Sequence, residues 1–256
     1  MQDAKEYLME QSKITQWEVV DNFGVLTINN PPQNFLTEPE FVRLSDLQRW
    51  TSNESLRGVI IQGKGRHFSA GADKDNILKV QGEEDIKNNL AKGKEILDYL
   101  WDLPIPTVAA IKGVCFGGGL EVALSCHMRI CSEQSVFSFP ETRLGIIPGL
   151  HGTVKLPGLI GMANAIEMLL TCKTLNAQEA LDLKLVDYVV PKNEVFDFSL
   201  NYLKKLTGDK PISLIHVVVK SFINTRKLPD DKAIEEGINV FCDLAIDISK
   251  NRKAEK

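Results

Sequence analysis

Two acidic residues have sequence neighbours that could give their carboxylates a role in proton transfer. Glu121 follows three consecutive glycines in GVCFGGGLEVALS (113–125), and Glu141 follows Pro140 in FSFPETRLGIIPGLHG (137–152). A carboxylate among apolar residues is poorly solvated, which raises its pKa and suits it to general acid or base catalysis. Taken alone, each residue could equally be an ordinary acid at the start of a helix.

Two segments of small residues could bring backbone N–H groups close to a ligand. The first, RHFSAGADKD (66–75), follows a β-branched run, and the second is the triple glycine 117–119, which precedes a predicted helix. Glycine and alanine allow close approach to the backbone, and a helix N-terminus has free N–H groups that stabilise an anion. A plain strand-to-helix turn is the alternative for the first segment. The glycine spacing matches neither the dinucleotide fingerprint nor the P-loop, and Ser69 lacks the glycines of a nucleophile elbow.

Composition and charge exclude several other classes of function. The chain has 256 residues, 43% of them hydrophobic, with a formal net charge of -4. A nucleic-acid binder needs a concentrated excess of Lys and Arg, so we predict none. No apolar run approaches the roughly 18 to 20 residues that span a bilayer, and residues 1–13 are polar where a signal peptide is apolar. We therefore expect a cytoplasmic protein without a membrane span.

The cysteines predict neither disulfides nor a metal site. They are odd in number and scattered through mostly apolar sequence: Cys115, Cys126, Cys131, Cys172 and Cys242. Cys126 and Cys131 lie near His127, but no second cluster supplies further ligands at zinc-like spacing. We interpret the thiols as reduced core residues and predict no metal.

The elements that must position these groups alternate along the first part of the chain. β-branched runs predict strands at 24–29, 58–62, 107–112 and 136–139. Apolar stripes at helical spacing predict helices at 37–49 and 85–101. This alternation is typical of an α/β fold. After residue 161 the sequence predicts mostly helices, at 164–170, 177–182, 193–206, 212–224 and 232–248, with one strand at 185–190.

The joint motif resembles the crotonase (enoyl-CoA hydratase/isomerase) superfamily. SAGAD, GGGLE and FPETRLGIIPG occur in this order, and Glu141 follows Glu121 by 20 positions (141 minus 121). The resemblance extends from Trp17 to Pro191 and includes NPP near the amino end and AQEALDLKLVDYVVP near residue 185. FPETRLGIIPG resembles the hydratase part of bacterial fatty-acid oxidation complexes.

The resemblance implies a role for each motif residue. The backbone N–H groups of Ala72 and Gly118 would form an oxyanion hole, and Glu121 and Glu141 would hold a catalytic water. The other residues implied to bind the substrate or its coenzyme A are Ala70, Gly71, Asp73, Lys74, Gly117 and Gly149. Coenzyme A or phosphopantetheine would enter as part of the substrate, with no tightly bound cofactor.

The resemblance also implies a fold and an assembly. We expect a spiral of repeated ββα units over residues 1–190 as the catalytic core and a helical trimerisation region over residues 191–256. The chain would then form homotrimers or hexamers.

Retention of both acids favours hydration or dehydration of an enoyl thioester. Isomerisation, and dehydration or decarboxylation of a polyketide intermediate on an acyl carrier protein, are the alternatives within the superfamily. A non-catalytic member that serves assembly or RNA binding is the alternative outside it, and the acidic charge speaks against RNA.

Two departures from the family pattern bear on these alternatives. His151 replaces a glycine of the common P-G-x-G-G, and it could narrow the acyl pocket, donate a hydrogen bond or point away. We interpret His127, which replaces a common Asp, as structural. The final FCDLAIDISKNRKAEK lacks the usual E-G-x-x-A-F-x-x-K-R, for which Lys250, Arg252 or Lys253 would be imperfect substitutes. A carrier-protein substrate therefore stays open beside coenzyme A.

Overall fold

A seven-stranded sheet forms the centre of the protein. The computed structural model describes residues 10–73 and 82–254, the last of these (247–254) by their backbone alone. The strand order is β1-β2-β3-β4-β5-β7-β10; the first two pairings are antiparallel and the other four are parallel. The strands are β1 (Glu10–Ser12), β2 (Thr15–Val20), β3 (Phe23–Ile28), β4 (Gly58–Gly63), β5 (Thr107–Ile111), β7 (Met128–Ser132) and β10 (Tyr188–Val190).

A second, three-stranded sheet lies beside the catalytic motifs. It has the order β6-β8-β9, with β6 (Val114–Phe116), β8 (Val136–Ser138) and β9 (Leu175–Asn176). Two isolated bridges link its surroundings to the small-residue turn, since Ser69 pairs with Cys115 and Leu36 pairs with Ala72. The segments around SAGAD and GGG are thereby held together.

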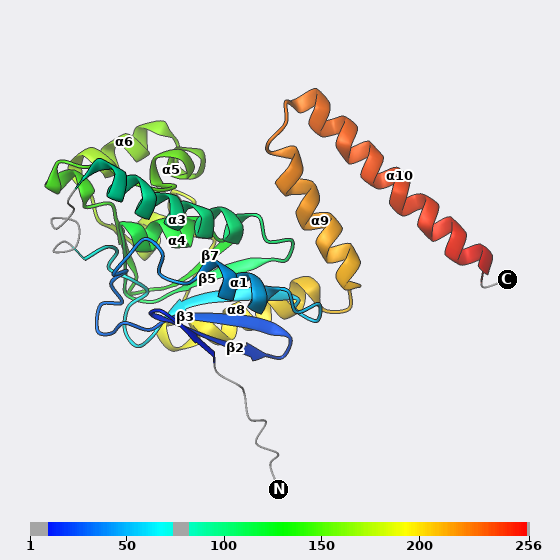
Figure 1. Ribbon diagram of the computed structural model, residues 1–256, viewed down its shortest axis with the longest axis horizontal. Coiled ribbons are helices and arrows are strands. Elements are labelled where there is room, and N and C mark those ends of the chain that lie inside the picture. The colour runs from blue at the N-terminus through cyan, green and yellow to red at the C-terminus, as the bar shows by residue number, and fades with distance from the viewer. Residues whose placement is uncertain (1–9, 74–81, 255–256) are drawn as a thin grey trace, which may run out of the picture.

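Helices cover both faces of the large sheet (Figure 1). Successive residues of a strand point to opposite faces, so Ile60 joins the core under one face while Val59 and Ile61 join the core under the other. The helix α8 (Val195–Thr207) completes the first core with Leu200 and Leu203. The remaining helices of the body are α1 (Leu44–Thr51), α3 (Glu83–Trp101), α4 (Gly118–Leu124), α5 (Gly152–Ile160), α6 (Met162–Thr171) and α7 (Ala177–Asp182).

The last two helices extend away from this body (Figure 1). They are α9 (Ile212–Thr225) and α10 (Asp230–Ala254), and α10 packs against α9. Arg226 and Lys227, just after α9, both pair with Asp102 at the end of α3. The arm formed by α9 and α10 is therefore tied to the body mainly at its first helix.

The predicted α/β class is confirmed, and every predicted strand overlaps a strand of the structure. The helix predicted at 37–49 begins later, at Leu44, and the strand predicted at 185–190 begins at Tyr188, because 183–187 forms a turn after α7. Leu185 and Val186 are buried there without strand pairing.

Two further sequence predictions concern absences. Within residues 10–73 and 82–254, no helix is long and apolar enough to cross a bilayer. The same described residues contain no cluster of three or more His, Cys, Asp or Glu side chains that could hold a metal ion. All five cysteines are free thiols, and Cys242 alone among them is exposed.

Candidate active site

Glu121 is a buried acid on the first turn of α4. Its side chain is only 3% exposed, which is deeper than the partial solvation that its sequence neighbours suggested. The carboxylate Oε1 accepts hydrogen bonds from the backbone N–H groups of Leu150 (2.9 Å) and Gly152 (2.8 Å) at the start of α5. Burial raises the pKa of Glu121, while these N–H donors favour the ionised form and oppose the rise.

Glu141 opens the 3-10 helix η1 (Glu141–Leu144) and lies over the glycine turn. A Cβ atom added at Gly117, whose φ is +50°, would come within 2.6 Å of the Glu141 Oε1. The other oxygen, Oε2, is buried and has no hydrogen-bond partner among the described residues. Burial, with a smaller contribution from the charge of Glu121, raises the pKa of Glu141 to about 7.

Two backbone N–H groups lie next to each other beside these acids. A Cβ atom added at Gly118 would be 3.8 Å from the Ala72 nitrogen, and one added at Gly71 would be 3.2 Å from the Gly118 nitrogen. Leu36 N–H donates to the Gly71 carbonyl at 2.8 Å and so holds the turn in place. Within the described part of the chain, the N–H groups of Ala72 and Gly118 have no protein acceptor, so they can donate to a ligand oxygen.

A cavity of about 310 Å³ opens beside Ala72, Gly117 and Glu141, and Glu121 and Gly118 are not among the residues that line it. Most of its lining comes from the segments that the sequence singled out: Phe35, Ala70, Ala72, Asp73, Gly117, Pro140, Glu141, Leu144 and Ile146. Four residues predicted to bind substrate or form the oxyanion hole therefore line it, together with one predicted acid. Phe35, Leu144 and Ile146 add apolar walls that the sequence did not predict as ligand contacts.

The other predicted site residues have different positions. Gly71 and Gly118 do not line the cavity themselves but are next in sequence to Ala70, Ala72 and Gly117, which do; Glu121 does not line it either. Gly149 packs near α3, where a Cβ atom added to it would be 3.0 Å from Leu90 Cδ2, and its role in binding stays a prediction. Lys74 lies outside the described residues.

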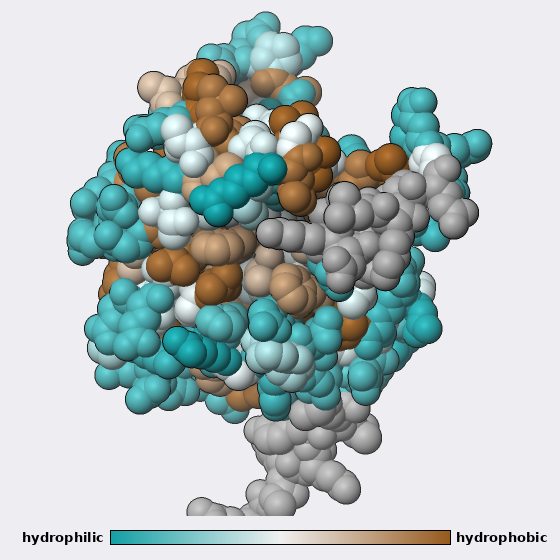
Figure 2. Space-filling view, turned by 90° about the vertical axis from the view of Figure 1, so that its left-hand side faces the viewer, coloured by the Kyte–Doolittle hydropathy of each residue, from teal (hydrophilic) through white to brown (hydrophobic). Residues whose placement is uncertain are grey.

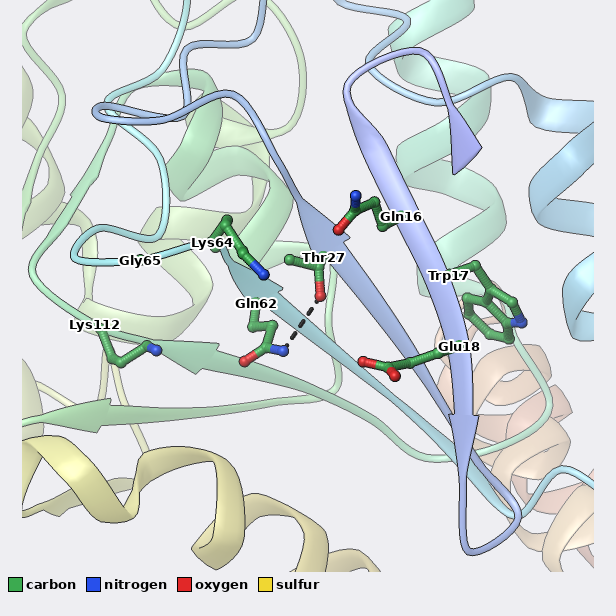
Figure 3. A pocket seen from close by; sticks show the side chains of 9 residues that line it. Gln16, Trp17, Glu18, Thr27, Gln62, Lys64, Gly65 and Lys112 are labelled. Atoms are coloured by element: carbon green, nitrogen blue, oxygen red, sulfur yellow. Dashed lines mark hydrogen bonds between the residues drawn. The ribbon is translucent and has the colours of Figure 1, made fainter. Parts of the chain in front are cut away.

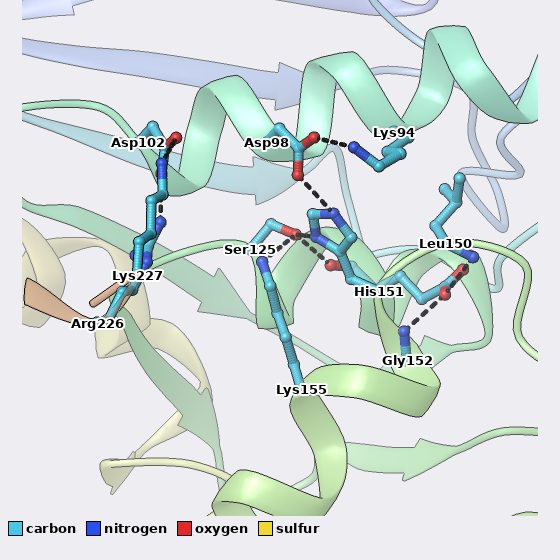
Figure 4. A network of polar contacts seen from close by, with 11 residues as sticks. Lys94, Asp98, Asp102, Ser125, Leu150, His151, Gly152, Lys155, Arg226 and Lys227 are labelled. Carbon is cyan, nitrogen blue, oxygen red and sulfur yellow. Dashed lines mark hydrogen bonds and ion pairs between the residues drawn. The ribbon is translucent and has the colours of Figure 1, made fainter. Parts of the chain in front are cut away.

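A polar network around His151 lies next to Leu150 and Gly152, the residues whose N–H groups bind Glu121 (Figure 4). His151 is 8% exposed, and its ring contacts Asp98 Oδ1 (2.9 Å) and Ser125 Oγ (3.0 Å). Lys155 donates to the same Ser125 hydroxyl at 3.3 Å and lies 3.8 Å from the centre of the Trp101 ring. The partners of His151 come from distant parts of the chain, so only His151 itself, which replaces a glycine of the common P-G-x-G-G, stood out in the sequence.

His127 is hydrogen-bonded within the fold, in agreement with its structural interpretation. Its Nδ1 accepts from the Thr107 N–H at 3.1 Å, and its Nε2 lies 3.2 Å from the Trp101 carbonyl. Burial lowers the pKa of His127 to about 4 and keeps the ring neutral.

A second cavity, of about 270 Å³, opens over strands β2, β3 and β4 (Figure 3). Polar side chains dominate it, including Glu18, Lys64 and Lys112, and Gln62 donates to the Thr27 hydroxyl at 3.2 Å. It contains one carboxylate and none of the glycine-turn amides. The cavity beside Glu141 therefore remains the better candidate for catalysis.

Comparisons with known proteins agree with this geometry. The sequence model described as Enoyl-CoA hydratase/isomerase matches residues 18–251. A protein of Bacillus subtilis (strain 168) named "Probable enoyl-CoA hydratase" is 42% identical over 169 residues, which cover 65% of this chain and 66% of that relative.

Solved structures show the same fold. DspI of Pseudomonas aeruginosa is 27% identical, with a TM-score of 0.85 over 94% of this chain and 98% of that one. An enoyl-CoA hydratase from Bacillus anthracis is also 27% identical, with a TM-score of 0.80 over 89% of each chain. These likenesses confirm the predicted crotonase-like fold, and the chain belongs to the enoyl-CoA hydratase/isomerase family of the crotonase superfamily.

Proposed function

We propose that the protein is an enoyl-CoA hydratase-type lyase, which adds or removes water across the α,β double bond of an acyl thioester. The observation that carries this proposal is the pairing of two buried acids with unlike surroundings beside two unpartnered N–H groups. Glu121 accepts two amide hydrogen bonds, whereas Glu141 keeps one buried oxygen without a protein partner. Such a pair can hold one ionised and one protonated carboxyl group at the same pH.

The proposed reaction uses each group once. Glu121, ionised, takes a proton from water as the water oxygen bonds to the β carbon. The displaced electron pair moves to the thioester oxygen, where the N–H groups of Ala72 and Gly118 stabilise the enolate. Glu141, protonated, then gives its proton to the α carbon. One oxyanion-hole donor is typically worth about 2.7 to 4 kcal/mol, so two supply much of the rate enhancement.

The carrier part of the thioester substrate would extend along the small-residue turn. Ala70, Asp73 and Gly117 line the cavity, which supports their proposed contacts with the substrate. Gly71 would act by shaping the turn, and Lys74 and Gly149 complete the proposed binding set. Coenzyme A is the proposed carrier, in keeping with the family to which the chain belongs.

Carrier-bound phosphopantetheine is the second candidate because EGINVFCDLA (236–245) keeps the Glu, Gly and Phe of the usual coenzyme A pattern but has Leu244 and Ala245 in place of its Lys-Arg pair. On such a substrate the same enolate chemistry would give dehydration or decarboxylation. Double-bond isomerisation is the third reaction that two acids and an oxyanion hole permit.

A panel of thioesters tests these alternatives. We would measure hydration of trans-2-enoyl groups of increasing length, each on coenzyme A and on carrier protein, by loss of the conjugated thioester absorbance. The proposal predicts hydration on coenzyme A for at least one length. Turnover of only carrier-bound or β,γ-unsaturated substrates would contradict it.

We also propose that the chain divides into a catalytic core (1–190) and a helical region (191–256) and assembles into homotrimers or hexamers. Exposed apolar side chains on the arm support assembly, among them Phe222 at 72% and Phe241 at 71% exposure. Apolar surface of this extent on two helices is typical of an interface.

A further inference from the structure

The two amides that bind Glu121 belong to the residues on either side of His151. Leu150 N–H and Gly152 N–H both donate to the Glu121 Oε1, and the His151 N–H between them also favours the ionised carboxylate, so residues 150–152 form a clamp on Glu121. The orientation of the two peptide units therefore decides where this carboxylate lies. The only side chain between them that could fix that orientation is the imidazole of His151.

The imidazole is anchored at both nitrogens by other elements. Its Nε2 is 2.9 Å from Asp98 Oδ1 on α3, and its Nδ1 is 3.0 Å from Ser125 Oγ at the end of α4 (Figure 4). Asp98 is held in turn by Lys94, one turn earlier on the same helix. The clamp is thus attached to α3 and to the helix that carries Glu121.

The partners determine how the protons are arranged. A carboxylate only accepts hydrogen bonds, so Nε2 carries the hydrogen and donates to Asp98. In a neutral ring Nδ1 then accepts from the Ser125 hydroxyl, which in turn accepts from Lys155; the single Ser125 proton then points away from the Glu121 carbonyl, 2.9 Å from the hydroxyl oxygen. Burial, and next the charge of Lys155, lower the pKa of His151 against the opposing effect of Asp98.

The other charged groups around the network are accounted for. Lys94 and Asp98 face the ring from α3, Lys155 from α5, and Glu121 lies on α4. Burial lowers the pKa of Lys155 to about 7, with smaller effects from Cys126, Arg226 and the acids of α3. A neutral imidazole that donates to Asp98 fits these contacts when the Ser125 proton points to Nδ1 rather than to the Glu121 carbonyl.

Ser125, His151 and Asp98 have the residue types of a hydrolase triad, but the burial excludes that role. Ser125 is 0% exposed, and its hydroxyl also lies 2.9 Å from the Glu121 carbonyl. No substrate carbon can reach an oxygen in that position. The three residues can act only through the groups that they hold.

We propose that His151 is a positioning residue, whose hydrogen bonds to Asp98 and Ser125 hold the 150–152 amides against Glu121 and fix the orientation of that carboxylate. The proposal rests on the proposed function only for its effect on hydration, because the geometry of the clamp is independent of the substrate. A loosened clamp would place the base poorly, and small misplacements of a catalytic group are costly to rate.

The test compares Asp98→Ala and His151→Gly with the unmodified protein. Asp98 is 45% exposed at its side chain, so Asp98→Ala leaves the core of α3 intact even if His151→Gly impairs folding. The Glu121 carboxyl carbon is titrated by 13C NMR and assigned by its absence in Glu121→Gln. Since N–H donors favour the ionised form, losing them should raise the pKa of Glu121 further. For hydration we expect kcat to fall about tenfold and KM to stay within about twofold.

Two variants separate positioning from charge. Asp98→Asn keeps an oxygen that accepts from Nε2–H. Its Glu121 pKa and its kcat for hydration should therefore lie close to those of the unmodified protein. Glu95→Ala removes the same charge from an exposed position on α3 and should behave as the unmodified protein. An unchanged Glu121 pKa in both Asp98→Ala and His151→Gly, or an equal shift in Asp98→Asn, would overturn the proposal. If the unmodified protein hydrates no enoyl thioester, the proposed function fails, and the carboxyl titration still decides the role of His151.

Discussion

Glu121 and Glu141 are both buried carboxylic acids whose pKa is raised by burial, yet the N–H groups of residues 150 and 152 oppose that rise at Glu121. Two backbone N–H groups stabilise a negative charge on Glu121, whereas Glu141 has an unpartnered oxygen and a pKa raised to about 7. Because two negative charges repel each other, the proton that leaves the pair last is bound more tightly than either residue alone would bind it. The proposed reaction needs this asymmetry, with the base ionised and the acid protonated.

The pKa of Glu141 makes a prediction about stability as well as rate. A carboxyl group whose pKa is higher in the folded than in the unfolded chain stabilises the fold below its unfolded value, 4.5, and this contribution is lost as the pH rises through about 7. Glu141→Gln cannot ionise, so it should be more stable than the unmodified protein at pH 8, by about 1 to 2 kcal/mol after allowance for partial exposure. Urea unfolding at pH 8 and pH 4.5 measures the difference, which should shrink at the lower pH.

A charge-matched control accompanies that experiment. Glu133 is exposed in a turn, so Glu133→Gln removes the same charge without relieving a buried carboxylate. Its stability should follow that of the unmodified protein at both pH values. If the free energy of unfolding at pH 8 rises no more in Glu141→Gln than in Glu133→Gln, the pKa of Glu141 is not raised in the folded protein.

At the scale of elements, the start of α4 places three functional groups within five residues. Gly117 makes the turn at positive φ, Gly118 offers its N–H, and Glu121 extends from the first helical turn. The Gly117 position has no room for a Cβ because the Glu141 carboxylate occupies that space. The triple glycine therefore joins the proposed oxyanion donor to both acids.

We expect Gly117→Ala to displace Glu141. The added methyl group would meet Oε1 at 2.6 Å, and φ of +50° is strained for alanine. The variant should lose about 1 to 2 kcal/mol of stability and at least tenfold in kcat for hydration, measured by urea unfolding and steady-state kinetics. Gly158→Ala is the matched control. Its Cβ meets nothing within 4 Å in α5, so it should be up to about 1 kcal/mol more stable with unchanged kinetics. Equal effects in the two variants would count against the close packing of Gly117 and Glu141.

Local patterns predicted the elements whose signal is local. The β-branched strands and the glycine-to-helix junction at Gly118 follow from residue types alone. The strand β2 was not predicted because polar residues interrupt its apolar ones. The helix α5 was not predicted because it contains Pro157. Motif resemblance supplied both acids and both amides. The partners of His151 could not be predicted, since Asp98 lies 53 positions away and only packing of α3 brings it near.

At the scale of the whole molecule, the arm of α9 and α10 leaves apolar surface open to solvent (Figure 1). Apolar side chains are also exposed on α5 and α6, including Val154 and Leu170, and Figure 2 shows apolar residues gathered among polar ones on one side of the body. A monomer would keep this surface in water at a cost in free energy. Burial between copies of the chain removes that cost.

We therefore predict that charges introduced on the arm weaken assembly. Phe222→Asp and Phe241→Asp should each lower the molecular mass found by light scattering after gel filtration, from a trimer or hexamer toward a monomer. Lys232→Asp changes an exposed polar position on α10 and should keep the original mass. An unmodified protein that is monomeric at micromolar concentration would refute the proposed homotrimer or hexamer.

The central claim is that Glu121 and Glu141 together hydrate an enoyl thioester. The most direct measurement is kcat for hydration of crotonyl-CoA by the unmodified protein, Glu121→Gln and Glu141→Gln, using the best chain length if crotonyl-CoA is poor. General acid or base catalysis typically contributes about 100-fold to 10,000-fold, so each variant should lose at least about 100-fold in kcat. A near-normal rate in either variant would contradict the account.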